Sequence, residues 1–154
     1  MASIQLYVAA ACAVVLALAA PALGGDPDML QGTSASLTTP PNPPHTHPRA
    51  TEIIFVLEGT LEVGFITTAN MLFTKSLTMG DVFVFPRGLV HFQQNRGYGP
   101  AAVVAAFNSQ LQGTQQIAMT LFGAMPPVPT DILAKAFRIG NGEVEHIKAN
   151  FAPM

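Results

Sequence analysis

The sequence has few cysteines and few charged residues, and each shortage excludes a class of protein. Its only cysteine is Cys12, so the chain is not a disulfide-stabilised scaffold, and a closed metal site built from several thiolates is excluded. Charged residues make up 10% of the chain and the formal net charge is -2, which gives no reason to expect a nucleic-acid partner. The motif Asn-x-Ser/Thr is also absent, so N-glycosylation is not expected.

Hydrophobic residues are abundant, at 49% of the chain, and part of this excess lies near the N-terminus. Every residue from Val8 to Ala20 is Ala, Val, Leu or Cys, and this run is short for a membrane span. It fits the core of a signal peptide, with small residues that offer cleavage sites at Ala20, Ala22, Gly24 and Gly25. We therefore expect residues 1–24 to direct secretion and to leave no membrane association after cleavage. Because no Lys or Arg precedes the run, an uncleaved anchor and a buried helix remain alternatives.

The middle of the chain consists of short apolar, β-branched segments separated by glycine and proline turns. Strands are expected at 53–57, 60–66, 71–77, 82–85, 90–92, 101–107 and 115–121. Strands at this spacing favour an antiparallel sandwich or barrel. After residues 126–129 the pattern becomes helical, which predicts one helix over 131–137 with Thr130 as its N-cap and a second from 142 or 143 to 150.

Three of the four histidines fall into a pattern with one glutamate. His45 and His47 are two residues apart, so in a strand both side chains point to the same face. Glu52 would point to the opposite face of a straight strand, and Pro48 is a reasonable place for the chain to break that parity. His91 must then come from another strand brought alongside, which implies a closed or sandwiched sheet.

This donor set narrows the metal that the site would bind. Three neutral imidazoles and one carboxylate leave coordination positions open, and they suit manganese, iron, zinc, nickel or copper better than calcium or magnesium. The alternative is that His45 and His47 are turn residues beside prolines. His146 lies among charged residues near the C-terminus, and we expect it to be a solvated surface residue.

Two motifs resemble the paired boxes of the germins and germin-like proteins, a plant family of the cupin superfamily. The first box is similar to the run His45-x-His47-x4-Glu52-x6-Gly59, and the second to the run Gly80-x5-Pro86-x-Gly88-x2-His91-x3-Asn95. The likeness extends from about Asn42 to near the C-terminus. It implies an all-β fold, a single cupin jelly-roll β-barrel with a short C-terminal helical segment. The implied organisation is a signal peptide at 1–24, a short N-terminal segment at 25–41, the barrel at 42–125 and C-terminal helices at 126–154.

The same resemblance implies a function and its residues. Germins are manganese proteins with oxalate oxidase activity, and several relatives have superoxide dismutase activity, both of which yield hydrogen peroxide. By resemblance His45, His47, Glu52 and His91 would hold manganese in an apoplastic defence protein that assembles into trimers or hexamers. Asn42 matches an asparagine that points into the germin site, and Asn95 is a second candidate behind the ligands. Both asparagines could instead be turn residues, and no catalytic residue is identified.

The sequence also departs from the germin pattern before the first box. Thr39 stands where germins usually carry a glycine, and the interval from Asp26 to Thr39 is too short to hold their cysteine pair and first barrel strands. We therefore expect an apparently shortened mature N-terminus with one barrel edge missing. This departure supports an alternative function, either a non-enzymatic metal-binding defence or receptor-like protein of the apoplast or an inactive shortened product.

Overall fold

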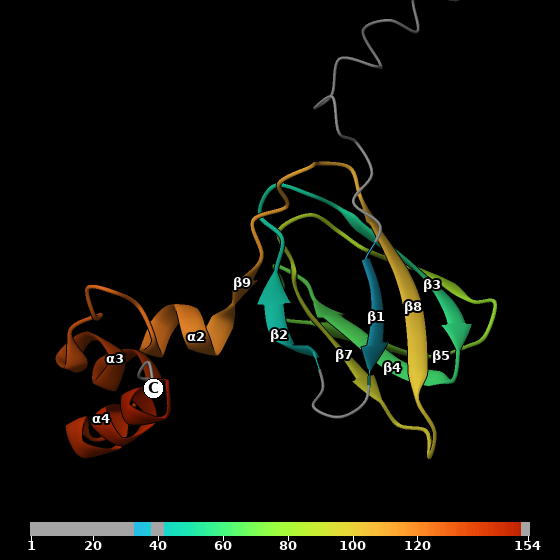
Figure 1. Cartoon of the computed structure of the whole chain (residues 1–154). Coiled ribbons are helices and arrows are strands. Elements are labelled where there is room, and N and C mark those ends of the chain that lie inside the picture. Colours follow the sequence, from blue (N-terminus) through green and yellow to red (C-terminus); the bar gives the residue numbers. More distant parts are fainter. Residues whose placement is uncertain (1–32, 38–41, 152–154) are drawn as a thin grey trace, which may run out of the picture.

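Two antiparallel sheets face each other across a hydrophobic interior (Figure 1). The computed structural model describes residues 33–37 and 42–151, so the predicted signal peptide lies outside the described residues. One sheet has the order β1 (Thr33–Leu37), β8 (Ala101–Phe107), β3 (Glu52–Glu58), β6 (Val82–Phe85). The other has the order β5 (Leu72–Thr78), β4 (Thr60–Ile66), β7 (Val90–Asn95), β2 (Asn42–Thr46), β9 (Gln115–Gln116). The predicted all-β class with a C-terminal helical segment is confirmed.

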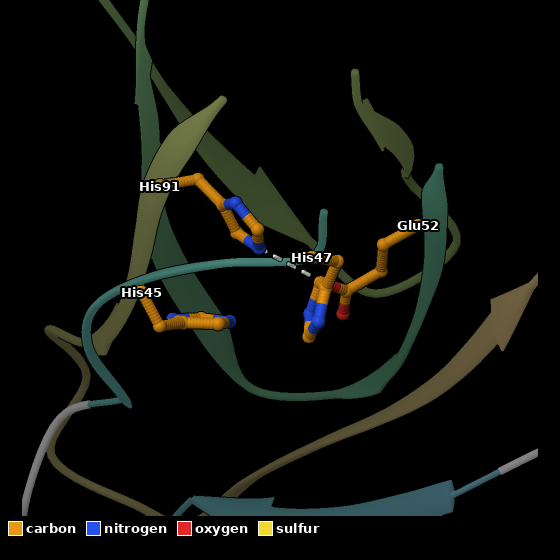
Figure 2. Close-up of side chains that lie close together, drawn as sticks. All are labelled: His45, His47, Glu52 and His91. Carbon is orange, nitrogen blue, oxygen red and sulfur yellow. Dashed lines mark hydrogen bonds and ion pairs between the residues drawn. The ribbon is translucent and has the colours of Figure 1, made fainter. Parts of the chain in front are cut away.

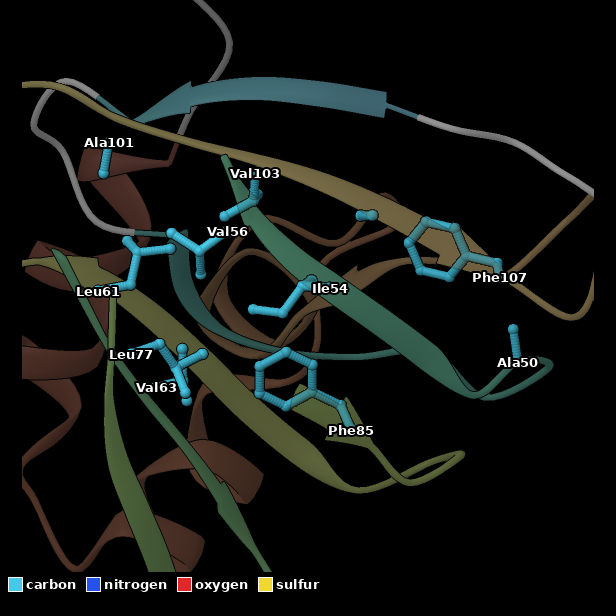
Figure 3. Packing of buried hydrophobic residues seen from close by; sticks show 11 residues of the cluster. Ala50, Ile54, Val56, Leu61, Val63, Leu77, Phe85, Ala101, Val103 and Phe107 are labelled. Atoms are coloured by element: carbon cyan, nitrogen blue, oxygen red, sulfur yellow. The ribbon is translucent and has the colours of Figure 1, made fainter. Parts of the chain in front are cut away.

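The core forms because the strands bury alternate residues. In β3, Ile54 and Val56 are buried while Ile53 and Phe55 are exposed, which is the two-residue period of a sheet with one face against the core. The side chains of both sheets meet between the layers in one cluster (Figure 3), formed by Ala50, Ile54, Val56, Leu61, Val63, Leu77, Phe85, Ala101, Val103, Ala105 and Phe107. Each large side chain buried in this way contributes roughly 1.5–3 kcal/mol to folding.

Strand β1 comes from the short segment that precedes the first histidine motif. It pairs with β8 in antiparallel register from Thr33 opposite Ala105 to Leu37 opposite Ala101. The four-stranded sheet therefore includes residues before position 42, where the barrel was predicted to begin. The missing barrel edge and the domain bounds stay predictions.

The predicted strand over 115–121 is wrong beyond its first two residues. The strand β9 ends at Gln116, and the helix α2 (Ile117–Phe122) begins directly after it. A short apolar run is compatible with either structure, and here tertiary packing decides. As a helix, this run places Ile117 and Leu121 beside Pro43 and Pro44 of β2.

The C-terminal helices α3 (Thr130–Phe137) and α4 (Asn141–Asn150) form a pair at one side of the sheets, joined to them through α2 (Figure 1). Leu133 and Val144 are buried between the helices. Thr130 is not the N-cap of α3, because that position is Pro129; its hydroxyl instead bonds Glu145 of α4. Within the residues described, no helix has both the length and the apolar character needed to cross a membrane.

Candidate metal centre

Strand pairing brings His45 and His91 side by side. β2 pairs antiparallel with β7, and His45 lies directly opposite His91 in that register. The ring centroids of this pair are 4.1 Å apart. Both histidines point from the five-stranded sheet toward the four-stranded sheet (Figure 2).

The other two side chains, His47 and Glu52, lie on either side of a turn that joins the two sheets. β2 ends at Thr46, a turn follows at positions 48 and 49, and β3 begins with Glu52 in the opposite sheet. The backbone carbonyl of His47 accepts hydrogen bonds from the N–H of Ala50 at 3.3 Å and of Gly88 at 3.0 Å, which holds the turn against the neighbouring loop. The predicted break of parity after His47 is confirmed, because Glu52 faces the same point as the histidines.

The four predicted residues therefore meet in one buried cluster (Figure 2). One ligand atom from each of His45, His47, Glu52 and His91 lies within 4.8 Å of all the others. Oε2 of Glu52 lies 3.0 Å from Nε2 of His47 and 3.1 Å from Nε2 of His91. That the four residues bind a metal stays a prediction, but the spacing is that of donors around a single ion.

The other ring nitrogens point away from the centre and are bonded. Nδ1 of His45 donates to the carbonyl of Pro43 at 2.8 Å, and Nδ1 of His91 donates to the carbonyl of Leu89 at 2.8 Å. A carbonyl oxygen only accepts, so both rings carry a hydrogen on Nδ1. Their Nε2 atoms are therefore directed at the centre, which is the arrangement that metal-binding histidines show.

The surroundings of His91 test whether a cation fits. Nδ1 faces one acceptor, the carbonyl of Leu89, while Nε2 faces a second acceptor, the carboxylate of Glu52. A neutral imidazole carries one hydrogen and bonds only one of these acceptors as a donor. Either a proton or a metal ion between Nε2 and the carboxylate satisfies this contact, and a metal ion there would also meet ligand atoms of the other two histidines. The donor set fits a metal ion.

Glu52 and His45 have the charge states that metal ligands need. Burial alone would raise the pKa of Glu52, but the hydrogen bonds with His47 and His91 outweigh it and lower this pKa to about 2. Burial, followed by the nearby His91, lowers the pKa of His45 from 6.5 to about 4. At neutral pH the metal-free site therefore holds an ionised Glu52 and a neutral His45.

Two amide side chains stand behind the carboxylate. Nε2 of Gln93 donates to Oε1 of Glu52 at 3.1 Å, and Nδ2 of Asn42 donates to Oε1 of Gln93 at 3.3 Å. Asn42, proposed from the sequence, is therefore beside the site. Gln93 was missed, although it lies two residues after His91 on the same strand and its side chain had to share the inward face.

An open cavity of about 170 Å³ adjoins the four candidate ligands. Its walls combine the polar residues of the site with an apolar side from β8, and it is lined by Asn42, His45, His47, Glu52, Gln93, Val103, Ala105, Phe107, Gln112 and Thr114. Gln112 and Thr114 were also missed. They come from the irregular connection between β8 and β9, where no periodicity indicates which way a side chain points.

Two further residues singled out from the sequence lie elsewhere. Asn95 is the last residue of β7, and it bonds the turn that follows: Nδ2 donates to the carbonyl of Gly99 at 2.8 Å, and Oδ1 accepts from the N–H of Gly97 at 2.8 Å. It is not among the residues that line the cavity, and these contacts match the alternative of a turn residue. His146 is exposed on α4, as expected.

Comparison with known proteins gives consistent matches. A family model described as Cupin matches residues 31–145. Germin-like protein 1-1 of Oryza sativa subsp. japonica is 54% identical over 215 aligned positions, which cover 98% of this chain and 100% of that protein. Because this alignment is longer than the 154 residues of the chain, part of it consists of gaps in the chain.

Other matches cover only part of the related protein. Germin-like protein 5-1 of Oryza sativa subsp. japonica is 69% identical over 112 residues, which cover 73% of this chain and 51% of that protein. The chain thus spans about half the length of this relative. A solved structure of oxalate oxidase in complex with the substrate analogue glycolate has a TM-score of 0.77 and 42% identity, and the match covers 80% of this chain and 63% of that one.

Proposed function

Because this chain belongs to the germin-like proteins of the cupin family, we propose that it is a manganese-dependent oxidoreductase that forms hydrogen peroxide as it oxidises oxalate or dismutates superoxide. The observation that carries the proposal is the convergence of three imidazoles and the Glu52 carboxylate at the wall of a cavity. A mixed nitrogen and oxygen donor set suits manganese, while iron, zinc, nickel and copper remain alternatives.

Oxalate is the first candidate substrate and superoxide the second. Oxidation of oxalate would give two molecules of carbon dioxide, while dioxygen takes up two electrons and two protons to form hydrogen peroxide. Dismutation of two superoxide ions with two protons would give dioxygen and hydrogen peroxide. The similarity to a solved oxalate oxidase supports oxalate. A bound manganese ion would supply a Lewis acid and a one-electron redox centre beside the cavity.

The chain's own residues have distinct proposed roles. His45, His47, Glu52 and His91 would hold the ion. Asn42 uses one N–H for Gln93, so its second N–H is the proposed donor to an oxygen of the substrate.

The far wall has a different role. Val103, Ala105 and Phe107 form an apolar side of the cavity. Such a wall limits access of water to the reacting oxygens, which strengthens electrostatic interactions inside the site. A small dianion fits this combination of polar donors and apolar wall better than a large substrate, since the cavity volume is about 170 Å³.

The proposed location is the plant apoplast, after removal of a signal peptide at residues 1–24. The apolar run from Val8 to Ala20 supports this location, and release of peroxide would suit a role in defence. Mass measurement of the mature protein from tissue tests the processing. A mature chain that still contained residues 8–20 would contradict it.

We also propose that the chain self-associates into trimers or hexamers. The C-terminal helices stand to one side of the sheets (Figure 1) and bury only Leu133 and Val144 fully among their described residues. An apolar groove of about 320 Å³ lies along α2, and its lining includes Pro44 of β2, Leu121 of α2 and Phe137 of α3. The proposed occupant of this groove is the helical segment α2 to α4 of a second copy of the chain. Light scattering of the purified protein would detect it, and a monomer at micromolar concentration would contradict it.

The test of the proposed activity measures metal content and peroxide release on the same sample. The parent loaded with manganese should release peroxide from oxalate or from superoxide. Glu52→Gln should lose most of the metal and the activity, whereas Glu58→Gln, on the same strand but exposed, should retain both. If Glu52→Gln kept full metal content, the four-residue site would be wrong.

A second candidate function is metal binding without catalysis. The observation in its favour is that the alignment with the rice relative contains gaps in this chain, so this chain lacks a segment that the relative has. A parent that binds manganese but releases no peroxide from either substrate would support this candidate and contradict the oxidoreductase.

A further inference from the structure

The connection between β8 and β9 passes beside the cavity of the metal centre. We call residues 108–114 the strap. Two of its side chains, Gln112 and Thr114, line the cavity together with His45, His47 and Glu52. The strap therefore contributes directly to the surroundings of the candidate ligands, although it carries none of them.

Arg49 fastens the strap to the turn that follows His47. Its backbone N–H donates to the carbonyl of Gln112 at 3.2 Å, and its side-chain Nε donates to the carbonyl of Leu111 at 2.6 Å. At the start of the strap, the side chain of Asn108 accepts a hydrogen bond from the backbone of Thr51 at 2.9 Å. Strap and turn are thus joined at Arg49 and again at Thr51.

Gly113 lets the strap pass close to this arginine. Its φ is +70 degrees, in the left-handed region of backbone angles that favours glycine. A Cβ atom at Gly113 would lie 2.6 Å from Cζ of Arg49. Both the backbone angle and the close contact therefore favour glycine at the position before Thr114.

Thr114 is the strap residue that touches a candidate ligand. Its Oγ1 lies 3.2 Å from Nδ1 of His47. The corresponding nitrogens of His45 and His91 are bonded to backbone carbonyls, so among the three histidines only His47 has its outward nitrogen held by a side chain. This contact is consequently open to a test by substitution.

We propose that Thr114 is a positioning residue of the metal centre, which orients His47 so that Nε2 binds the cation, and that Arg49 holds the strap in the position this requires. The inference rests on the proposed metal site. When Nε2 binds a cation, the ring hydrogen lies on Nδ1 and needs an acceptor. The hydroxyl oxygen of Thr114 supplies that acceptor.

The first test replaces the hydroxyl without changing the volume of the side chain. Thr114→Val puts a methyl group where Oγ1 stood, while Thr114→Ser keeps the oxygen. Affinity for Mn²⁺ is measured by competition with a chelator. Loss of a partner behind a metal ligand typically weakens binding by ~10- to 100-fold, so we expect Thr114→Val to lose about tenfold and Thr114→Ser to stay close to the parent.

A matched control and a check of the fold complete this test. Thr120→Val makes the same change at an exposed position of α2 and should leave Mn²⁺ affinity unchanged. Circular dichroism of the metal-free variants should match the parent. Equal affinity of Thr114→Val and the parent would overturn the role of Thr114 alone. A parent that binds no Mn²⁺ would overturn the metal site and this inference together.

The second test addresses Arg49. Arg49→Gln removes the Nε contact with Leu111 but keeps the backbone hydrogen bond to Gln112, so the strap should loosen without coming free. We expect amide hydrogens of residues 108–114 to exchange faster and Mn²⁺ affinity to fall several-fold. Arg87→Gln, which removes a contact with Pro48 instead, is the control for loss of an arginine. Unchanged exchange and affinity in Arg49→Gln would overturn its role.

Discussion

Gln93 donates a hydrogen bond of 3.1 Å from Nε2 to Oε1 of Glu52, the carboxylate oxygen opposite the one that faces His47 and His91. Gln93 is itself buried, at 3% exposure, and is bonded in turn by Asn42. The carboxylate is therefore held from both sides. This arrangement fixes which of its oxygens is directed at the metal centre.

Removal of that hydrogen bond should weaken the site. Gln93→Met keeps a similar volume but leaves Oε1 of Glu52 buried without this donor, which costs about 1–3 kcal/mol. We expect Mn²⁺ affinity to fall roughly tenfold, measured by chelator competition. Gln94→Met, on the opposite face of the same strand, should leave it unchanged. Equal affinities of both variants would contradict a role for Gln93.

Stability of the metal-free protein should decrease with acid in two windows. The pKa of His45 is about 4 in the folded chain, below its ordinary value of 6.5, so the unfolded chain binds the proton more readily and stability falls as pH falls from 6.5 toward 4. The pKa of Glu52 is about 2, against 4.5. The stability it contributes is present above pH 4.5 and is lost as pH falls toward 2.

Urea unfolding after removal of metal by a chelator measures this dependence. Between pH 7 and 4.5 we expect His45 to account for a loss on the order of 2 kcal/mol. The variant His45→Gln should lack the upper window and keep the lower one. A parent whose free energy of unfolding decreased no more than that of His45→Gln over this range would argue against a buried neutral imidazole at position 45.

Phe85 links the hydrophobic core to the metal centre. It is 1% exposed, and its ring stacks on that of His91 with centroids 4.5 Å apart. Phe85→Ala should cost roughly 3–5 kcal/mol through lost burial and the cavity left behind, and it should also weaken metal binding because the His91 ring loses its support. Tyr98→Ala, at a fully exposed position, should change stability by less than about 0.5 kcal/mol. Denaturant unfolding compares the two, and similar values would contradict this placement of Phe85.

The sequence predicted regular strands and the gathering of the four site residues well. The strands over 60–66, 82–85 and 101–107 have the predicted bounds, because alternation and glycine turns mark them clearly. His45, His47, Glu52 and His91 meet because strand pairing and one turn determine their directions. These features depend on local patterns that can be read from the residues themselves.

The remaining features depend on contacts between distant segments. Thr114 contacts His47 across 67 residues of sequence, and the strap that carries it has no repeating pattern. The run from Ile117 to Phe122 is too short for its composition to decide between strand and helix. The segment Thr33–Leu37 has only one large apolar residue, Leu37, so no alternation indicated the strand that pairs with β8.

The location of bound metal tests the central claim most directly. A crystal of the protein grown with manganese, measured at wavelengths on both sides of the manganese absorption edge, would show where the ion lies. We expect one anomalous peak in the described part of the chain, within bonding distance of Nε2 of the three histidines and of a Glu52 oxygen. A peak elsewhere, or no peak between these four side chains at full manganese loading, would contradict the account.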